Sequence, residues 1–173
     1  MDPHVLELLF VRWFARGAVP LTMIECEEFR TLLIYISKDI DSWLPSSADT
    51  IKQWILRTYQ DHKILQKAEL QAAKSKIHIS CDMATTHNNL AVLAVCAHYI
   101  SKTGDLKKMT LALKEIDGSH TGENLATAIY GITEDWSIST NVGYFVMDNA
   151  VVNDKMLKEY SIRKLMPYSC LIT

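Results

Sequence analysis

Hydrophobic residues in the first third of the chain recur with the period of an α-helix. One helical face holds Leu6, Leu9, Phe10, Trp13 and Phe14. Gly17 and Pro20 are expected to end this helix. Thr22 and Glu25 have the spacing of a capping box and predict the start of a second helix. The predicted buried stripe of that helix is Phe29, Leu32, Leu33 and Ile36.

A long third helix is predicted from a cap at Ser47 or Asp49 to about Ala73. Its apolar stripe is Ile51, Trp54, Ile55, Tyr59, Leu65, Ala68 and Ala72. Its positive charges are Lys52, Arg57, Lys63, Lys67 and Lys74. These charges form either a solvated basic face or a phosphate-binding face, and the sequence leaves both open.

The pattern changes after Lys76 to the alternation of β-strands. Ile77, Ile79 and Cys81 alternate with polar residues, and the apolar run 90–97 predicts a strand buried on both faces. Thr103 to Asp105 predict a turn, and 109–116 alternate again, which favours an antiparallel meander of three strands.

The second part of the sheet is predicted from two helices and one more strand. A helix opening at 122–124 would bury Leu125, Ala128, Ile129 and Ile132. Residues 143–147 predict a fourth buried strand, followed by a helix over 154–160. The order βββαβα after the helices predicts an α+β fold with a mixed sheet, in which the fourth strand lies parallel and next to the first.

Composition and charge narrow the class of protein. The chain has 173 residues, 49% of them hydrophobic, so it can bury a core and is not disordered. A net charge of −2 provides no overall electrostatic argument for nucleic-acid binding. The N-terminus does not read as a signal peptide, no apolar run is long enough for a membrane span, and the four cysteines lack zinc spacing. We therefore expect an intracellular protein with no membrane segment.

Two acids stand where strands are predicted to end. Asp82 follows 77–81, and Asp148 follows 143–147. If the two strands are parallel neighbours, both carboxylates lie at one end of the sheet, where they would attract Mg²⁺ or Mn²⁺. Such a pair supports phosphodiester cleavage. The alternative is that each aspartate caps a turn or the following helix.

Three stretches resemble the hAT superfamily of DNA transposases, in particular its fungal members: KSKIHISCDMATTHNNLAVLAVCAHYIS, LALKEIDGSHTGENLA and NVGYFVMDNAVVND. The resemblance covers roughly residues 5–160 and implies an RNase H-like fold. It implies that Asp82 and Asp148 are the first two catalytic acids and that Asn149 supports the metal. His120, Gly122, Glu123 and Asn153 match the family's motifs, and helix capping is the alternative role for the first three.

The departures from the family predict lost activity. Met83 to Thr86 replace the family's aromatic "x-W-T-S", and no segment matches the third acid, a Glu. The expected division is a helical segment 1–75, a truncated RNase H-like core 76–160 and an unrelated tail 161–173. We therefore expect a truncated, catalytically inactive transposase fragment.

The resemblance also implies cofactors, partners and a location. The intact family uses Mg²⁺ or Mn²⁺, and we expect weak binding or none here. The expected partners are DNA and a protein or second copy at an open sheet edge, and the expected location is the nucleus. The alternative function is a domesticated module that binds nucleic acid or protein without catalysis.

Overall fold

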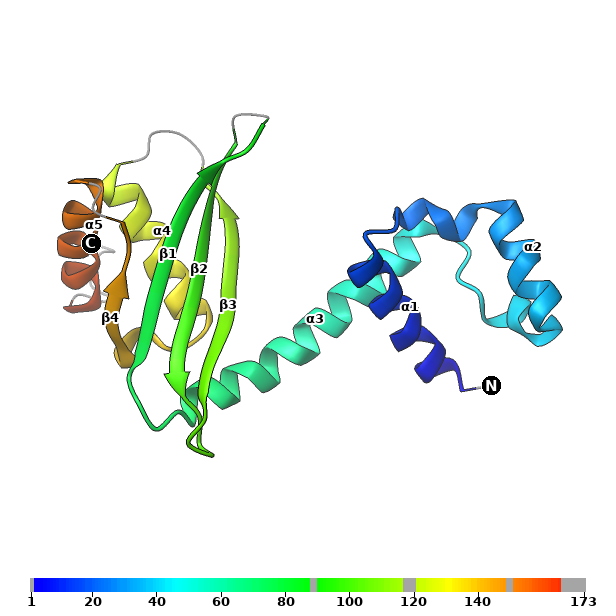
Figure 1. Ribbon diagram of the computed structural model, residues 1–173, viewed down its shortest axis with the longest axis horizontal. Coiled ribbons are helices and arrows are strands. Elements are labelled where there is room, and N and C mark those ends of the chain that lie inside the picture. Colours follow the sequence, from blue (N-terminus) through cyan, green and yellow to red (C-terminus); the bar gives the residue numbers. More distant parts are fainter. Residues whose placement is uncertain (1, 88–89, 117–120, 149–150, 166–173) are drawn as a thin grey trace, which may run out of the picture. The chain divides into compact units, whose positions relative to one another are not determined.

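The chain folds into a helical unit and a unit built around a four-stranded sheet (Figure 1). The computed structural model describes residues 2–87, 90–116, 121–148 and 151–165. The units are Met1–Leu65 and Gln66–Thr173, whereas the expected boundary lay at residue 75. Leu70 is fully buried in the core of the sheet unit, so the last turns of the third helix belong to that unit.

The helical unit contains α1 (Pro3–Gly17), α2 (Glu27–Ile36) and most of α3 (Ala48–Gln71), with 3₁₀ helices at Leu21–Glu25 and Lys38–Trp43. Asp2 caps α1 by accepting the backbone N–H groups of His4 and Val5. The hydroxyl of Ser47 accepts the N–H of Thr50 and caps α3, as predicted. The core of the unit consists of Phe10, Phe14, Ile24, Ile40, Leu44 and Ile51.

Two predictions for the second helix are wrong. Thr22 and Glu25 lie in the first 3₁₀ helix, because this tight turn carries the fully buried Ile24 into the core. The Glu25 carboxylate instead accepts the N–H of Ala48 at the start of α3. The buried stripe is also wrong in part, because Leu32 and Ile36 are 56% and 71% exposed.

The stripe predicted for the third helix holds only in its first half. Ile51 is buried, and Trp54 and Ile55 pack against the same core. Tyr59 and Leu65 are exposed, because that core contacts only the first turns of α3.

The sheet contains β1 (Ile77–Thr85), β2 (Ala91–Ile100), β3 (Leu106–Glu115) and β4 (Val142–Val146) in the order β3-β2-β1-β4. β1, β2 and β3 are antiparallel, and β4 pairs in parallel with β1, with Ile79 opposite Phe145. α4 (Gly122–Asp135) and α5 (Val151–Leu165) pack on one face of the sheet. The predicted α+β fold and strand arrangement are confirmed.

Two strands differ from their predicted burial. Alternate residues of β2 are buried, and the residues between them are half-buried except for the exposed Ile100, so only one face of this strand is fully covered. β4 is not a buried strand, because it forms an edge of the sheet among the described residues. Tyr144 and Val146 are 76% and 62% exposed.

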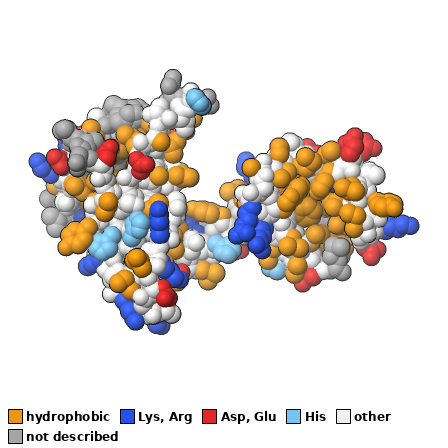
Figure 2. All heavy atoms as spheres, viewed as in Figure 1, with side chains coloured by type: hydrophobic (Ala, Val, Ile, Leu, Met, Phe, Trp, Pro, Cys, Tyr) orange, Lys and Arg blue, Asp and Glu red, His pale blue; other side chains and the backbone are white. Residues whose placement is uncertain are grey.

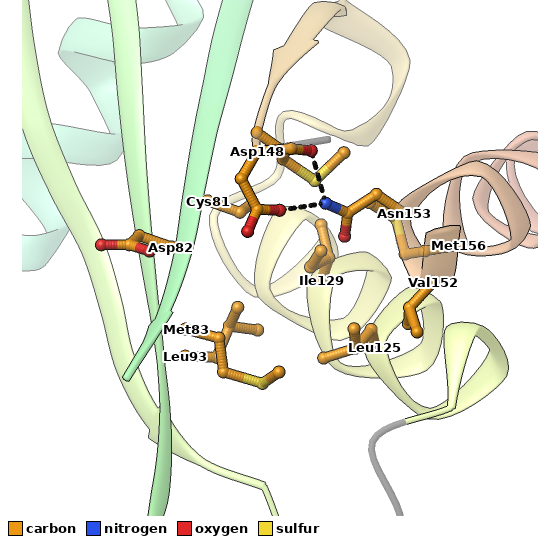
Figure 3. A pocket seen from close by; sticks show the side chains of 11 residues that line it. Cys81, Asp82, Met83, Leu93, Leu125, Ile129, Asp148, Val152, Asn153 and Met156 are labelled. Carbon is orange, nitrogen blue, oxygen red and sulfur yellow. Dashed lines mark hydrogen bonds between the residues drawn. The ribbon is translucent and has the colours of Figure 1, made fainter. Parts of the chain in front are cut away.

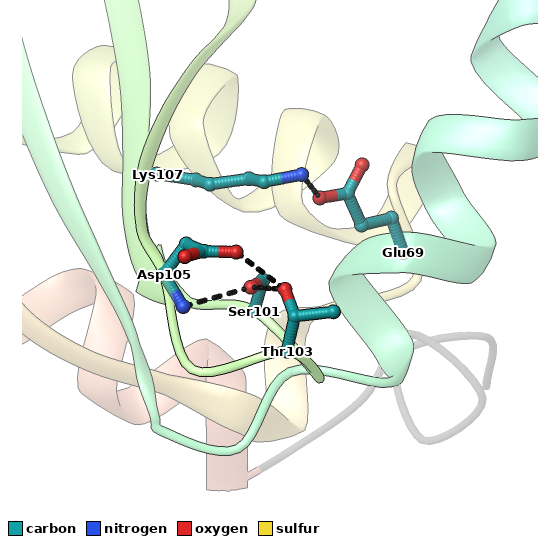
Figure 4. A network of polar contacts seen from close by, with 5 residues as sticks. All are labelled: Glu69, Ser101, Thr103, Asp105 and Lys107. Carbon is teal, nitrogen blue, oxygen red and sulfur yellow. Dashed lines mark hydrogen bonds and ion pairs between the residues drawn. The ribbon is translucent and has the colours of Figure 1, made fainter.

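The β2–β3 connection is held by polar contacts (Figure 4). The Thr103 hydroxyl donates to Asp105, and the Asp105 N–H donates to the Ser101 hydroxyl. Lys107 of β3 forms a 2.6 Å ion pair with Glu69 near the end of α3. The predicted turn is confirmed, and this ion pair ties the end of α3 to the sheet.

Among the helices that the structure describes, none is long and apolar enough to cross a membrane.

Candidate functional site

The two candidate acids come from neighbouring strands at the same end of the sheet. Ser80 of β1 pairs with Val146 of β4 in a parallel ladder. Asp82 and Asp148 each lie two residues further along the chain. Because parallel strands run in the same direction, both residues lie toward the same end of the sheet. The prediction that the first strand ends before Asp82 is wrong, because β1 continues to Thr85 and Asp82 pairs with Ala94 of β2. The topology that the sequence predicted therefore places both aspartates at that end.

Their side chains point in different directions. Ile77 and Ile79 of β1 face the helices and are fully buried, and Cys81 packs against the same core. Since successive side chains of a strand alternate between its faces, Asp82 belongs to the opposite face. Figure 3 shows the Asp82 carboxylate pointing away from the cavity, whereas Asp148 points toward Asn153. The fold thus brings the two strands together without aiming the carboxylates at one point.

Asp148 is connected to the first turn of α5. The side-chain amide of Asn153 donates to the Asp148 carboxylate at 2.7 Å and to the Asp148 backbone carbonyl at 2.9 Å (Figure 3). These bonds hold the carboxylate where the chain passes from β4 into α5. Asn153, which the sequence analysis matched to a motif of the family, therefore orients Asp148. This contact links Asp148 to α5 through a side chain, which differs from the turn or helix cap that the sequence analysis gave as the alternative.

A cavity of about 160 Å³ lies beside these residues, between the sheet and the two helices. Most of the residues that line it are apolar: Met83, Leu93, Leu125, Ile129, Met147, Val152 and Met156. Cys81, Asp148 and Asn153 complete the lining, and Asp82 borders the cavity while its carboxylate points away from it. Sequence reasoning did not assign Cys81 to the site, although its inward position in the alternation of β1 would have placed it there. Burial raises the pKa of the Cys81 thiol to about 12, so the group stays protonated near neutral pH.

The segment that opens α4 has a structural role. Thr121 caps α4 by accepting the N–H of Asn124. Glu123 forms a 2.6 Å ion pair with Lys155 of α5, and this bond lowers the pKa of the Glu123 carboxyl. The buried Gly122 lies against Lys155 and Met156 of the same helix. Both motif residues therefore fasten α4 to α5, and neither is among the described residues that line the cavity.

Two further predicted residues, His120 and Asn149, lie outside the described residues. The roles that the resemblance implied for them stay predictions.

The basic residues of α3 are partly engaged in pairs. Arg57 forms an ion pair with Glu7 of α1. Lys67 pairs with Asp135 of α4 at 3.7 Å. This arrangement favours the solvated, paired interpretation of these charges over a phosphate-binding face.

Among the residues that the structure describes, the donor set does not fit a two-metal centre. Within the described ranges there is no group of three or more His, Cys, Asp or Glu residues able to hold a metal ion. Hydrated Mg²⁺ ions that act as a pair need carboxylates aimed at a common point. Asp82 and Asp148 point apart, and the Cys81 thiol is protonated.

Comparison with known proteins identifies the sheet unit. Residues 80–171, more than half of the chain, match the family model of the ZBED1 RNase-like domain. The chain belongs to this family. The match begins in β1 just before Asp82 and includes 161–171, a stretch that we expected to lie outside the resemblance.

Individual relatives of this ZBED1 RNase-like chain are transposases and a regulator. It is 25% identical over 136 residues to a putative AC transposase of Zea mays and, equally, to a putative AC9 transposase of the same species. Each match covers 78% of this chain and 16% of the relative. A putative transcriptional regulator, tpeD of Talaromyces stipitatus, is 23% identical over 153 residues, which are 87% of this chain and 18% of the regulator.

The chain spans less than a fifth of the length of these relatives. No solved structure matches it. The relation to transposases that the sequence resemblance predicted is confirmed.

Proposed function

We propose that this chain forms the central strands of a transposase-type RNase-like domain and acts as a DNA-associated scaffold that does not itself cut DNA. The observation that carries the proposal is the divergence of the two aspartates at the end of the sheet. Cleavage by bound metal ions depends on carboxylates that share those ions. Here Asp148 is held by Asn153, and Asp82 lies on the opposite face of β1.

The role of DNA as the partner rests on relatedness. The relatives are named as transposases and as a transcriptional regulator. A DNA-associated role would place the chain in the nucleus. Because the net charge is −2, we expect the affinity of the isolated chain for duplex DNA to be weak and salt-sensitive.

A nicking assay tests the absence of cleavage. The full chain is incubated with supercoiled plasmid and millimolar Mg²⁺ or Mn²⁺, and the relaxed product is quantified. We expect no nicking above a preparation of the Asp82→Ala, Asp148→Ala double variant. Nicking that is present in the wild type and lost in both single variants would overturn the proposal.

Melting curves separate a metal pair from a helix-linking role. We expect Asp148→Ala to lower stability by about 1 kcal/mol, because the amide of Asn153 loses its acceptor. Asp82→Ala should change stability by less than about 0.5 kcal/mol, because its carboxylate is exposed. Asp154→Asn, an exposed acid in the first turn of α5, is the matched control for charge.

The decisive comparison is between melting curves recorded with and without millimolar Mn²⁺. We expect it to shift the wild type and the three variants by the same small amount. A shift that is present in the wild type and in Asp154→Asn, but absent from both Asp82→Ala and Asp148→Ala, would establish a shared metal site.

A second candidate function is a protein-binding module. The observation that favours it is the exposed apolar edge of the sheet at Tyr144 and Val146. An unpaired strand edge accepts a further strand through its backbone N–H and C=O groups. If the wild-type chain does not bind duplex DNA at low salt but binds an extended peptide at β4, these two results would favour this function over the DNA-associated scaffold.

A further inference from the structure

The sheet has one covered face and one open face. Its buried side chains, among them Ile77 and Ile79 of β1, point toward α4 and α5. In the part of the chain that the structure describes, no helix covers the other face (Figure 1). Since side chains alternate along a strand, His78 of β1 and His98 of β2 belong to this open face. The side chains on the open face therefore determine what the sheet can bind.

One row of side chains crosses the four strands on the open face. His78 lies opposite His98 in the β1–β2 ladder, and His98 lies opposite Lys108 of β3. On the other side of His78, the ring of Tyr144 of β4 stacks on the His78 imidazole, with centroids 5.3 Å apart and planes 6° from parallel. In Figure 2, histidine side chains lie beside lysine and hydrophobic side chains on the visible face of the sheet unit. The row is therefore Tyr144, His78, His98 and Lys108, in the order of the strands.

The ring at the β4 end of the row is held in place and yet accessible. The register of the β1–β4 ladder shifts between Ile77 and Ile79. At this irregularity the backbone N–H of Tyr144 donates to Nδ1 of His78 at 3.1 Å. Tyr144 is nevertheless 76% exposed. A fixed aromatic ring with an accessible face is a surface on which another planar ring can stack.

Lysines border the row on both sides. Lys108 is exposed at the β3 end. Lys76, also exposed, lies beside His78, because a Cβ atom added to Gly143 of β4 would be 2.9 Å from both the Lys76 Cβ and the His78 Nδ1. Within the described residues, neither lysine belongs to an ion pair. Both charges are therefore available to an anionic ligand.

The open face is divided by charge along the strands. Its acids lie further along: Asp82 follows His78 by four residues of β1, and Glu115 follows Lys108 by seven residues of β3. At about 3.3 Å per residue, these separations are about 13 and 23 Å. The row therefore lies in the basic part of the face, where phosphate groups are favoured.

We propose that the open face of the sheet binds single-stranded DNA, with an unpaired base stacked on Tyr144 and phosphates at Lys76 and Lys108. The inference rests on the proposed DNA-associated function and names the surface that carries it. Unpaired bases have free planar faces that stack on exposed aromatic rings, while lysines contact the phosphate backbone. Duplex DNA keeps its bases stacked inside the helix, so it contacts only the lysines.

Fluorescence anisotropy of the full chain with a short labelled single strand, and with the duplex of the same sequence, tests the proposal. At low salt we expect the single strand to bind roughly tenfold more tightly than the duplex. Tyr144→Ala should weaken binding of the single strand by roughly tenfold, because the stacked base loses its partner. Tyr144→Phe should keep the wild-type affinity, because phenylalanine retains the ring. Tyr144 is exposed, so circular dichroism should show unchanged folding in both variants.

The matched control is a tyrosine of similar exposure outside the sheet. Tyr35 of α2 is 88% exposed, and Tyr35→Ala should bind the single strand as the wild type does. Ultraviolet cross-linking to a single strand that carries iododeoxyuridine locates the stacked base directly. We expect the cross-link in the peptide that contains Tyr144. A cross-link confined to the helical unit would overturn the proposal.

The salt dependence of binding tests the two lysines. Two phosphate contacts to a single strand predict a slope of about −1.4 for log affinity against log salt concentration. Lys76→Gln and Lys108→Gln should each reduce the size of this slope by about 0.7, because each removes one phosphate contact. Lys158→Gln is the control for charge, since Lys158 is exposed on α5, which packs on the opposite face of the sheet. It should leave the slope unchanged.

The possible results distinguish this inference from the proposed function. Equal or tighter binding of the duplex would overturn the inference and leave the DNA-associated scaffold standing. Single-strand binding that Tyr144→Ala leaves unchanged would have the same consequence, because the base then stacks elsewhere or not at all. Absence of binding to either form of DNA at low salt would overturn both.

Discussion

At the scale of single residues, the contact between α4 and α5 depends on the absence of a side chain at Gly122. A Cβ atom at this position would lie 2.7 Å from the Lys155 Cβ and 2.8 Å from the Met156 backbone nitrogen. Real Cβ atoms do not approach other heavy atoms so closely, so the two helices would have to separate. The glycine of the TGEN segment therefore has a packing reason, beside the Glu123–Lys155 ion pair.

We expect Gly122→Ala to lower the free energy of unfolding by about 1–3 kcal/mol through overpacking. The control is Gly131→Ala in the same helix, where a Cβ would meet nothing within 4 Å. That change should raise stability by about 0.5–1 kcal/mol, because alanine loses less backbone freedom on folding. Urea denaturation followed by circular dichroism measures both. Equal effects of the two substitutions would contradict the packing role.

The buried thiol of Cys81 predicts a pH dependence above pH 9. Burial raises its pKa from the ordinary 9.0 to about 12 in the folded chain. The unfolded chain releases this proton from pH 9, whereas the folded chain retains it, so stability present below pH 9 is lost as pH rises toward 12.

Between pH 8 and 10, the wild type should lose about 1 kcal/mol more than Cys81→Ala. Urea titrations at both pH values measure this difference. The variant is the internal control, since Tyr99 and the other groups titrate in both proteins. Identical losses in the two proteins would show that the thiol is accessible to water.

At the scale of elements, the two edges of the sheet differ in charge. The β3 edge carries Lys107, Lys108 and Lys114, which discourage pairing with another strand. β4 has the sequence VGYFV and no charged residue. Tyr144 and Val146 of this strand are exposed. The uncharged edge therefore has the features of a site for strand addition or aggregation.

Val146→Lys should slow the aggregation of the chain, and it should change stability by less than about 0.5 kcal/mol. Leu113→Lys on β3 is the matched control, since Leu113 is 73% exposed on the edge that lysines already protect. Turbidity and thioflavin fluorescence over time give the readout. Equal suppression by both substitutions would show that β4 has no special part in aggregation.

At the scale of the whole molecule, the described residues form two cores that share no buried residue. The helical unit is built on six buried side chains around Phe14 and Ile24. The sheet unit has a larger core that includes Val95 and Ile129. Because stability grows with the apolar area buried, we expect the helical unit to unfold at a lower denaturant concentration than the sheet unit.

Tryptophans separate the two transitions. Trp13, Trp43 and Trp54 belong to the helical unit, and Trp136 is the one tryptophan of the sheet unit. In a Trp136→Phe background, fluorescence follows the helical unit, while circular dichroism follows both. At a concentration that keeps the chain monomeric, we expect the fluorescence midpoint to precede the final circular-dichroism transition.

Conservative core variants assign each transition to a unit. Ile24→Val should shift only the first transition and Ile129→Val only the second, each by about 1 kcal/mol. A single transition that both variants move would show that the units unfold together.

The sequence determined most of the topology, because the spacing of hydrophobic residues and the order of the elements are both visible along the chain. The alternation at 77–81, the turn at Thr103–Asp105 and the face of α4 at Leu125 and Ile129 all appeared in the structure as predicted. The parallel pairing of β4 with β1 followed from the helix between the third and fourth strands. Each of these features depends on residues within one element or on the order of elements.

The tertiary structure decided which apolar residues are covered and where side chains point. The run 90–97 is apolar on both faces, but α4 and α5 cover only one of them. Leu32 and Ile36 fit a buried stripe by spacing, yet the small core of the helical unit contacts their neighbours Phe29, Leu33 and Ile34 instead.

The same limit applies to the acids. The sequence predicted that Asp82 and Asp148 lie at one end of the sheet. In the structure, the Asp82 side chain lies on the face of β1 that points away from the helices, whereas the bond from Asn153 holds the Asp148 carboxylate toward α5. Burial and side-chain direction depend on partners that are distant in sequence, and the spacing of residues within an element carries no information about those partners.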